Sequence, residues 1–172
     1  IVSYGFKDGF YYKPRVDIEL LEKYHEGIVA LSACLAGPVA RTIIRQGYDK
    51  GKEVALRYNN IFGENNFFLE LQDHMDGSVD QQTVNQSLMR MHQETGIPLV
   101  ATNDCHYISP EDAEAHDILL CIQTNTTVDE ADRMRYEGGQ YYVKSPEEMY
   151  SLFPYAHQAC ENTYKIAQRC NV

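Results

Sequence analysis

The sequence lacks the features of a membrane-bound or secreted protein. No apolar run approaches the roughly 20 residues that a membrane-spanning helix needs, and the first residues form neither the basic nor the apolar region of a signal peptide. The five cysteines are odd in number and contain no Cys-x-x-Cys pair, which argues against a disulfide framework. We therefore expect a soluble, cytoplasmic protein with reduced thiols and no membrane partner.

Positive charge is also scarce. Lys and Arg number 15 against 25 Asp and Glu, which gives a formal net charge of -10. A surface that grips nucleic-acid phosphates needs clustered Lys and Arg, so the chain is not expected to be a general nucleic-acid-binding module. The acidic balance suits a domain that gathers carboxylates around cations.

Low-complexity tracts, internal repeats and clear linkers are absent too. The 172 residues suffice for one domain with a sizeable core, and we expect a single domain over residues 1–172. Because the chain begins with Ile1 rather than Met, we expect it to be a piece of a longer protein.

Short apolar runs predict three buried strands, at residues 27–33, 67–71 and 98–102. Apolar residues at helical spacing predict two helices between the first two strands, ending at Gly47 and Gly63, and one helix before the third, ending at Gly96. This β-α-α-β-α-β order is typical of an α/β fold with a parallel sheet or barrel.

The remainder of the chain reads as helices and loops. A capping hydroxyl followed by Pro and two acids predicts helix starts at Ser109 and at Ser145. Residues 155–170 have a helical pattern, whereas the segment from Arg133 to Gly139 is expected to be an exposed loop.

The strongest chemical signal is an Asp-x-His triplet directly after the third predicted strand. Alternate side chains of an extended chain share a face, so Asp104 and His106 are expected to point the same way and Cys105 to point away. In α/β folds, sites form at the carboxyl ends of strands, and a carboxylate beside an imidazole can take one divalent cation. The alternative is an Asp that only orients the His or caps the next segment.

Two other predicted strands also end in residues that can bind metal. Cys34 follows the first strand and precedes a helix, whose amino terminus would favour the thiolate form that ligates Zn²⁺. The alternative is a small buried residue at a tight turn. His74 follows the second strand, where it is a ligand, a neighbour of the ligands, or an exposed loop residue.

The remaining candidates have simpler interpretations. His116 is interpreted as part of a solvated helix face. The other thiols lie among apolar neighbours in helical patterns and are interpreted as packing residues: Cys121, Cys160 and Cys170.

Several blocks of sequence, taken in order, resemble a known family. They are the segments 9–17, 31–34, 69–74, 101–107, 142–149 and 167–171. Together they closely resemble the carboxyl-terminal part of the PHP (polymerase and histidinol phosphatase) domain of bacterial DNA polymerase III alpha subunits, and the resemblance spans essentially the whole chain.

The resemblance implies part of a distorted seven-stranded β/α barrel with up to three metal ions at the carboxyl ends of its strands. Cys34, Asp104 and His106 match metal ligands of the family, and His74 matches a histidine near the site. The early His-x-His motif and the first barrel strands would precede Ile1. The polymerase palm domain, with its catalytic aspartates, would follow Val172.

The resemblance also implies functions and partners. The parent would be a DNA-directed DNA polymerase that uses Mg²⁺, acts on DNA and meets a sliding clamp and a proofreading exonuclease. The PHP domain would add metal-dependent phosphoesterase or 3′–5′ exonuclease chemistry, although this piece alone is expected to be inactive. A thiolate beside imidazole and carboxylate favours Zn²⁺, with Mn²⁺ or Fe²⁺ as alternatives.

Two other functions stay open, and so does the association state. One is a non-catalytic scaffold that docks a separate proofreading exonuclease. The other is a histidinol-phosphatase-like metallohydrolase. An open barrel edge would also favour self-association of this piece.

Overall fold

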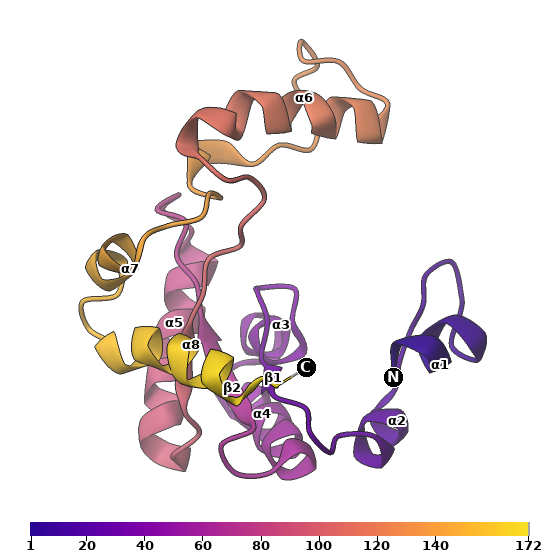
Figure 1. Cartoon of the computed structure of the whole chain (residues 1–172), viewed down its shortest axis with the longest axis vertical. Helices are drawn as coiled ribbons and strands as arrows, with labels where there is room; N and C mark the ends of the chain where they lie inside the picture. Colours follow the sequence, from indigo (N-terminus) through magenta and orange to yellow (C-terminus); the bar gives the residue numbers. More distant parts are fainter. Residues whose placement is uncertain (172) are drawn as a thin grey trace.

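A parallel three-stranded sheet lies at the centre of the computed structural model, which describes residues 1–171 (Figure 1). Its strands are β1 (Ala30–Leu31), β2 (Phe67–Leu71) and β3 (Leu99–Ala101), in that order across the sheet. Ala30 pairs with Phe67, and Leu69 pairs with Leu99. The predicted α/β class and the three parallel strands are confirmed, but the first strand, predicted as buried over residues 27–33, covers only Ala30–Leu31 and is not buried. A seven-stranded barrel is not seen among the described residues.

The predicted crossover helices are also confirmed. Between the first two strands lie α3 (Pro38–Gln46) and α4 (Tyr48–Phe62), which are separated by a glycine. Helix α5 (Val79–Thr95) also ends at a glycine, before the third strand. The final helix, α8 (His157–Arg169), packs beside β3, where the Asn162 side chain donates a 2.7 Å hydrogen bond to the Leu99 carbonyl.

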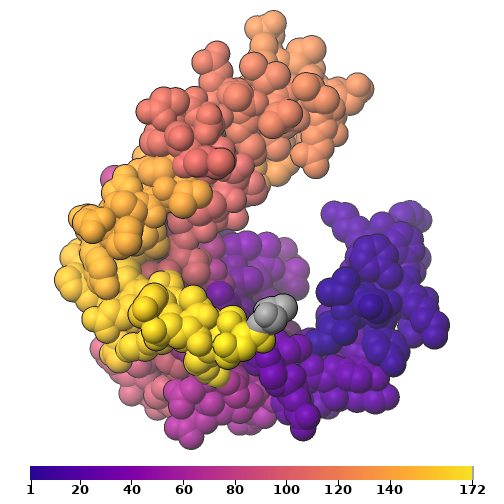
Figure 2. Space-filling model, viewed as in Figure 1, coloured from indigo at the N-terminus to yellow at the C-terminus, as the bar shows by residue number. Residues whose placement is uncertain are grey.

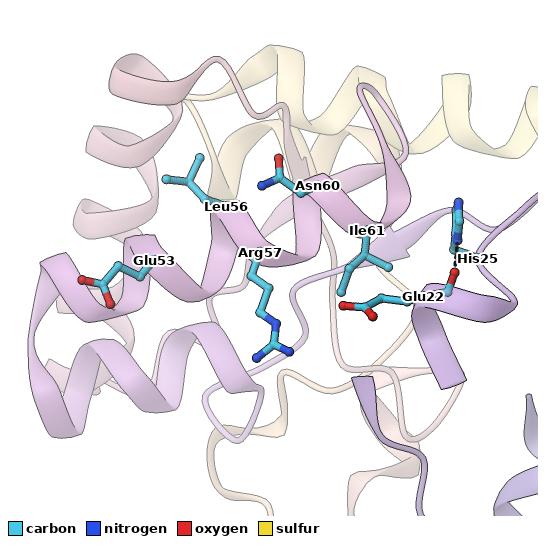
Figure 3. A pocket seen from close by; sticks show the side chains of 7 residues that line it. All are labelled: Glu22, His25, Glu53, Leu56, Arg57, Asn60 and Ile61. Carbon is cyan, nitrogen blue, oxygen red and sulfur yellow. Dashed lines mark hydrogen bonds between the residues drawn. The ribbon is translucent and has the colours of Figure 1, made fainter. Parts of the chain in front are cut away.

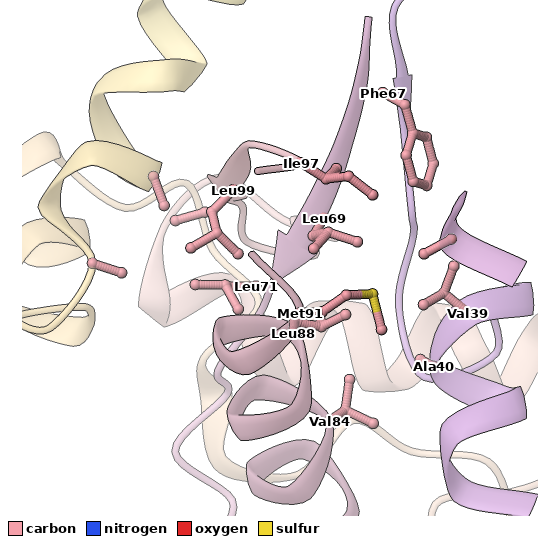
Figure 4. Packing of buried hydrophobic residues seen from close by; sticks show 14 of the residues in the cluster. Val39, Ala40, Phe67, Leu69, Leu71, Val84, Leu88, Met91, Ile97 and Leu99 are labelled. Atoms are coloured by element: carbon pink, nitrogen blue, oxygen red, sulfur yellow. The ribbon is translucent and has the colours of Figure 1, made fainter. Parts of the chain in front are cut away.

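One face of the sheet and the helices packed on it form the hydrophobic core (Figure 4). Leu69 and Leu71 of β2 are fully buried against Leu88 and Met91 of α5. Alternate side chains of a strand point to opposite faces. Glu70 therefore lies on the other face of β2, where it is nevertheless buried, with 9% of its surface exposed.

Helices α3 and α4 approach each other closely. Gly51, on the first turns of α4, is buried, and a Cβ atom there would lie 2.3 Å from Cγ1 of Ile43 on α3. Only a residue without a side chain fits this contact in the present packing. The sequence predicted both helices but not the contact.

The sheet and the helices α3, α4, α5 and α8 form the body of the molecule. Two arms extend from this body and give the molecule an open, curved outline (Figure 2). The amino-terminal arm contains α1 (Val2–Lys7) and α2 (Ile18–Lys23). The second arm contains the short helix η1 (Pro110–Asp112), then α6 (Ala113–Thr124) and η2 (Glu137–Gly139). Helix α7 (Pro146–Leu152) leads back to the body.

The predicted helix starts in this region are confirmed. The Asp112 carboxylate accepts a 2.9 Å hydrogen bond from the Ser109 N–H, and Glu148 accepts a 2.7 Å bond from the Ser145 N–H. These contacts satisfy backbone donors that a helix start leaves free. No helix within residues 1–171 is both long and apolar enough to span a bilayer.

Candidate functional site

The Asp104 and His106 side chains lie together just beyond the carboxyl end of β3. His106 Nε2 is 3.2 Å from Asp104 Oδ2, and the two side chains are 30% and 44% exposed. Cys105 points to the other side, where its Sγ lies 3.4 Å from the Tyr142 carbonyl in a groove beside α7 and α8. The predicted orientation of these three side chains is confirmed, and metal binding by the pair stays a prediction.

Backbone contacts hold this pair in place. The Asn103 side-chain amide donates to the carbonyls of Gln140 and Tyr142, at 3.0 and 2.7 Å. The His106 N–H donates to the Tyr141 carbonyl at 2.7 Å. The segment before α7 therefore lies against the Asp-x-His segment and restricts its backbone.

His74 is buried near the same pair. Its ring stacks on Tyr141 with a centroid distance of 4.4 Å, and Tyr141 lies 5.9 Å from the His106 ring. Burial lowers the pKa of His74, although the nearby carboxylate of Asp104 acts in the opposite direction. His74 Nδ1 is buried without a hydrogen-bond partner. The neutral ring thus offers a nitrogen lone pair, a property that a metal ligand requires.

Aromatic rings from the second arm surround His106. Tyr136 lies 4.2 Å and His116 lies 5.4 Å from the His106 ring, centroid to centroid. The interpretation of His116 as a solvated residue is wrong, because it is half-buried between His106 and Tyr107. Neither His116 nor Tyr136 stands in a recognisable motif, so only the fold brings them to this place.

The loop expected between Arg133 and Gly139 is not uniformly exposed. The Arg133 side chain is 4% exposed and donates two 2.6 Å hydrogen bonds to the Asp117 carboxylate of α6. These hydrogen bonds lower the pKa of Asp117. A single ion pair across a long sequence separation gives no pattern that sequence reasoning can detect.

Cys34 lies in the loop between β1 and α3 and is exposed. The Cys34 carbonyl accepts a 2.8 Å bond from the Gly37 N–H, which makes the tight turn that the sequence suggested. Among the other thiols interpreted as packing residues, Cys121 and Cys160 are buried, but Cys170 is exposed.

The side chains of the described residues do not form a complete metal site. Within residues 1–171, no three His, Cys, Asp or Glu side chains stand close enough to hold one ion. The structure brings Asp104 to His106, but it does not group Cys34 with them. Metal binding by Asp104, His106, Cys34 or His74 therefore stays a prediction.

A separate depression lies between α2 and α4 (Figure 3). Glu22 and Glu53 line it together with Arg57, so its charges are mixed. His25 Nδ1 lies 2.8 Å from the Glu22 carbonyl and is therefore already in use. None of the predicted site residues lies in this depression.

Comparison with known proteins shows what the chain is similar to. The model of the PHP domain matches residues 1–74, which include Cys34 and His74. The chain is 42% identical over 171 residues to a DNA polymerase III subunit alpha of Borreliella burgdorferi, covering 99% of this chain and 15% of that protein. The same named protein of Deinococcus radiodurans is 41% identical over 173 residues, covering 99% of the chain and 13% of the relative.

The matches thus cover almost all of this chain but only a small part of each relative. The chain spans about one seventh of the length of the curated relatives that it matches, as the 14% share for the Treponema pallidum protein also illustrates. The first 74 residues are thus similar to the PHP domain, and almost the whole chain is similar to one segment of proteins named DNA polymerase III subunit alpha.

Proposed function

We propose that this chain is part of the alpha subunit of a bacterial replicative DNA polymerase. The observation that carries the proposal is the 42% identity over 99% of the chain. Residues 1–172 would form the carboxyl-terminal part of the PHP domain, with α8 leading toward the polymerase palm. The parent would act in the cytoplasm on DNA with Mg²⁺, together with a sliding clamp and a proofreading exonuclease.

Within that protein, we propose a divalent metal site that includes Asp104, His106 and Cys34, with His74 beside it. The 3.2 Å contact at the end of β3 supports the proposal, because it places a carboxylate and an imidazole side by side. A thiolate in the ligand set favours Zn²⁺, with Mn²⁺ and Fe²⁺ as alternatives. Ligands from other parts of the polymerase would complete the site.

The proposed chemistry is hydrolysis of a phosphoester at a DNA 3′ end. A bound metal would supply an activated water and would stabilise the leaving oxygen. In that site the ion would take the place of the proton between His106 Nε2 and Asp104 Oδ2, which lie 3.2 Å apart, so that the nitrogen lone pair and the carboxylate oxygen would both face it. The Tyr141 carbonyl would hold the His106 backbone. The ring of Tyr141 against His74 and the ring of Tyr136 against His106 would limit access of water.

The test uses the full-length polymerase with the substitution Asp104→Asn. We expect bound metal, measured by elemental analysis, to fall by at least one equivalent, with 3′–5′ exonuclease activity lost and polymerase activity retained. Asp129→Asn, which changes an exposed acid outside the site, is the matched control and should change neither quantity. Unchanged metal content and exonuclease activity in Asp104→Asn would refute the metal site.

A second candidate is a non-catalytic scaffold for a separate proofreading exonuclease. It is favoured by the absence of any three-ligand group within residues 1–171. On this view, Asp104→Asn leaves metal content and replication fidelity unchanged, while the polymerase still captures the exonuclease in a pull-down. A polymerase that captures no exonuclease would exclude the scaffold.

A further inference from the structure

Glu70 is a buried acid in the middle of the central strand, and its carboxylate has no cationic partner. Only 9% of the residue is exposed, and none of the ion pairs in the described part of the chain involves it. A buried carboxylate is costly unless hydrogen bonds replace its lost hydration. The groups that donate hydrogen bonds to the Glu70 carboxylate therefore indicate its role.

These donors come from the ends of all three strands. Glu70 Oε2 accepts a 2.9 Å hydrogen bond from the Ala33 N–H, just after β1. Glu70 Oε1 accepts a 2.5 Å bond from the Thr102 hydroxyl, just after β3, and a 3.4 Å bond from the Gln72 amide, just after β2. The Gln72 amide also donates to the Thr102 hydroxyl at 3.2 Å. One carboxylate thus joins three loops.

Two of the joined loops carry the candidate ligands. Ala33 immediately precedes Cys34, and Thr102 lies two residues before Asp104. Ala33 has a φ of 65°, a left-handed conformation that residues other than glycine rarely adopt without support. The hydrogen bond from its N–H to Glu70 is such a support.

We propose that Glu70 is a positioning residue, which fixes the Cys34 loop relative to the strand end that carries Asp104 and His106. This inference rests on the proposed metal site, but the hydrogen-bond geometry exists without metal. Glu70 contacts neither candidate ligand side chain and acts through the backbone of Ala33 and the hydroxyl of Thr102. Replacement of such supporting residues typically weakens metal binding about 10- to 100-fold.

The test compares three variants of the full-length polymerase. Glu70→Met keeps the side-chain length but removes every acceptor. Glu70→Gln keeps one oxygen for the Ala33 N–H, while its amide can donate to the Thr102 hydroxyl. Ser32→Ala is the matched control, because the Ser32 hydroxyl accepts a 2.8 Å bond from the Glu70 N–H and not the bond of the Ala33 N–H, which goes to the Glu70 carboxylate.

The first readout is hydrogen exchange at the Ala33 amide, measured without metal. We expect exchange about tenfold faster in Glu70→Met, the factor that the loss of one hydrogen bond of typical strength gives. Glu70→Gln and Ser32→Ala should stay near the wild-type rate. Equal acceleration in Glu70→Met and Ser32→Ala would mean a general loss of stability and would overturn the proposal.

The second readout is titration with Co²⁺, whose thiolate charge-transfer absorption reports ligation by Cys34. We expect the midpoint in Glu70→Met to rise at least tenfold in Co²⁺ concentration, with Glu70→Gln close to the wild type. Thr102→Val removes the hydroxyl that donates to Glu70 and accepts from Gln72, and it serves if Glu70→Met does not fold; an unchanged midpoint in that variant would overturn the proposal. A wild-type protein without thiolate absorption would refute the metal site itself, and the exchange experiment would still decide the role of Glu70 in holding the Cys34 loop.

Discussion

The sheet-centred body and the second arm are held together by different forces. In the body, Leu69, Leu71 and Met91 are fully buried. In the arm, large apolar side chains of α6 are solvent-exposed, with Ile118 at 47% and Ile122 at 73%. The arm relies instead on an ion pair, helix caps and ring contacts. Asp104 and His106 lie where the body and the second arm meet. The body supports one side of the site, and the polar segment of the arm covers the other.

The largest effect should follow from damage to the body. Leu69→Ala removes a fully buried side chain of β2 and should lower the free energy of unfolding by about 2–5 kcal/mol. Urea denaturation measures the change. Ile122→Ala on α6 is the counterpart in the arm and should change the free energy by less than about 0.5 kcal/mol. Similar losses in the two variants would show that the arm also has a buried core.

A smaller effect is expected at the junction. Asn103→Ala removes both hydrogen bonds to the carbonyls of Gln140 and Tyr142 and should destabilise that contact by about 1–3 kcal/mol. Hydrogen exchange should accelerate in residues 136–144 and stay unchanged in β2. Acceleration throughout the sheet would contradict the separation of body and arm.

A local effect is expected within the arm. Arg133→Met breaks both hydrogen bonds to Asp117, so the segment after α6 should become more sensitive to chymotrypsin while the body resists cleavage. Arg135→Met removes a neighbouring exposed arginine whose side chain contacts only the Glu130 carbonyl and should leave the cleavage rate near wild type. Equal sensitivity of the two variants would argue against the Arg133–Asp117 pair as the anchor.

The smallest effect is expected in the pH dependence of stability, through the contact between α4 and α5 of the body. Hydrogen bonds from Lys52, Tyr48 and Arg90 lower the pKa of Glu94 to about 2, from 4.5. A lowered folded-state pKa gives stability that is fully present above about pH 4.5 and is lost as the pH falls toward 2. Glu94→Gln should therefore flatten the dependence of stability on pH in that window.

Thermal unfolding between pH 2 and pH 6 measures this dependence. Glu53→Gln, which changes an exposed glutamate on α4, is the matched control. If Glu94→Gln keeps the wild-type slope, other carboxylates govern acid unfolding.

The body was predictable from the sequence, because hydrophobic periodicity and glycine stops are local signals. The strands near Ala30, Leu69 and Val100 all appear where apolar runs placed them. Strand alternation also predicted that Asp104 and His106 share a side, although the chain there has left β3 and makes a tight turn, in which the Cys105 N–H donates to the Asn103 carbonyl at 3.0 Å. The rest of the site depends on contacts between distant segments. Tyr136 reaches His106 only through the fold of the arm, and no spacing rule connects them.

The role of Glu70, which lies inside the body, was also not predictable from the sequence. In the sequence, it is one polar residue within the apolar run Phe67–Leu71, and that pattern shows only a strand. Its role becomes visible when Ala33 and Thr102, separated from it by 37 and 32 residues, donate hydrogen bonds to its carboxylate.

The contact between Gly51 and Ile43 has an evolutionary consequence. Because a Cβ at position 51 would lie 2.3 Å from the Ile43 side chain, the sizes of these two residues should vary together among homologues. A relative with alanine at position 51 should carry a residue without γ carbons, such as alanine, at position 43. In a library that randomises both positions, folded members should show this reciprocal relation, and a large residue at both positions should be absent.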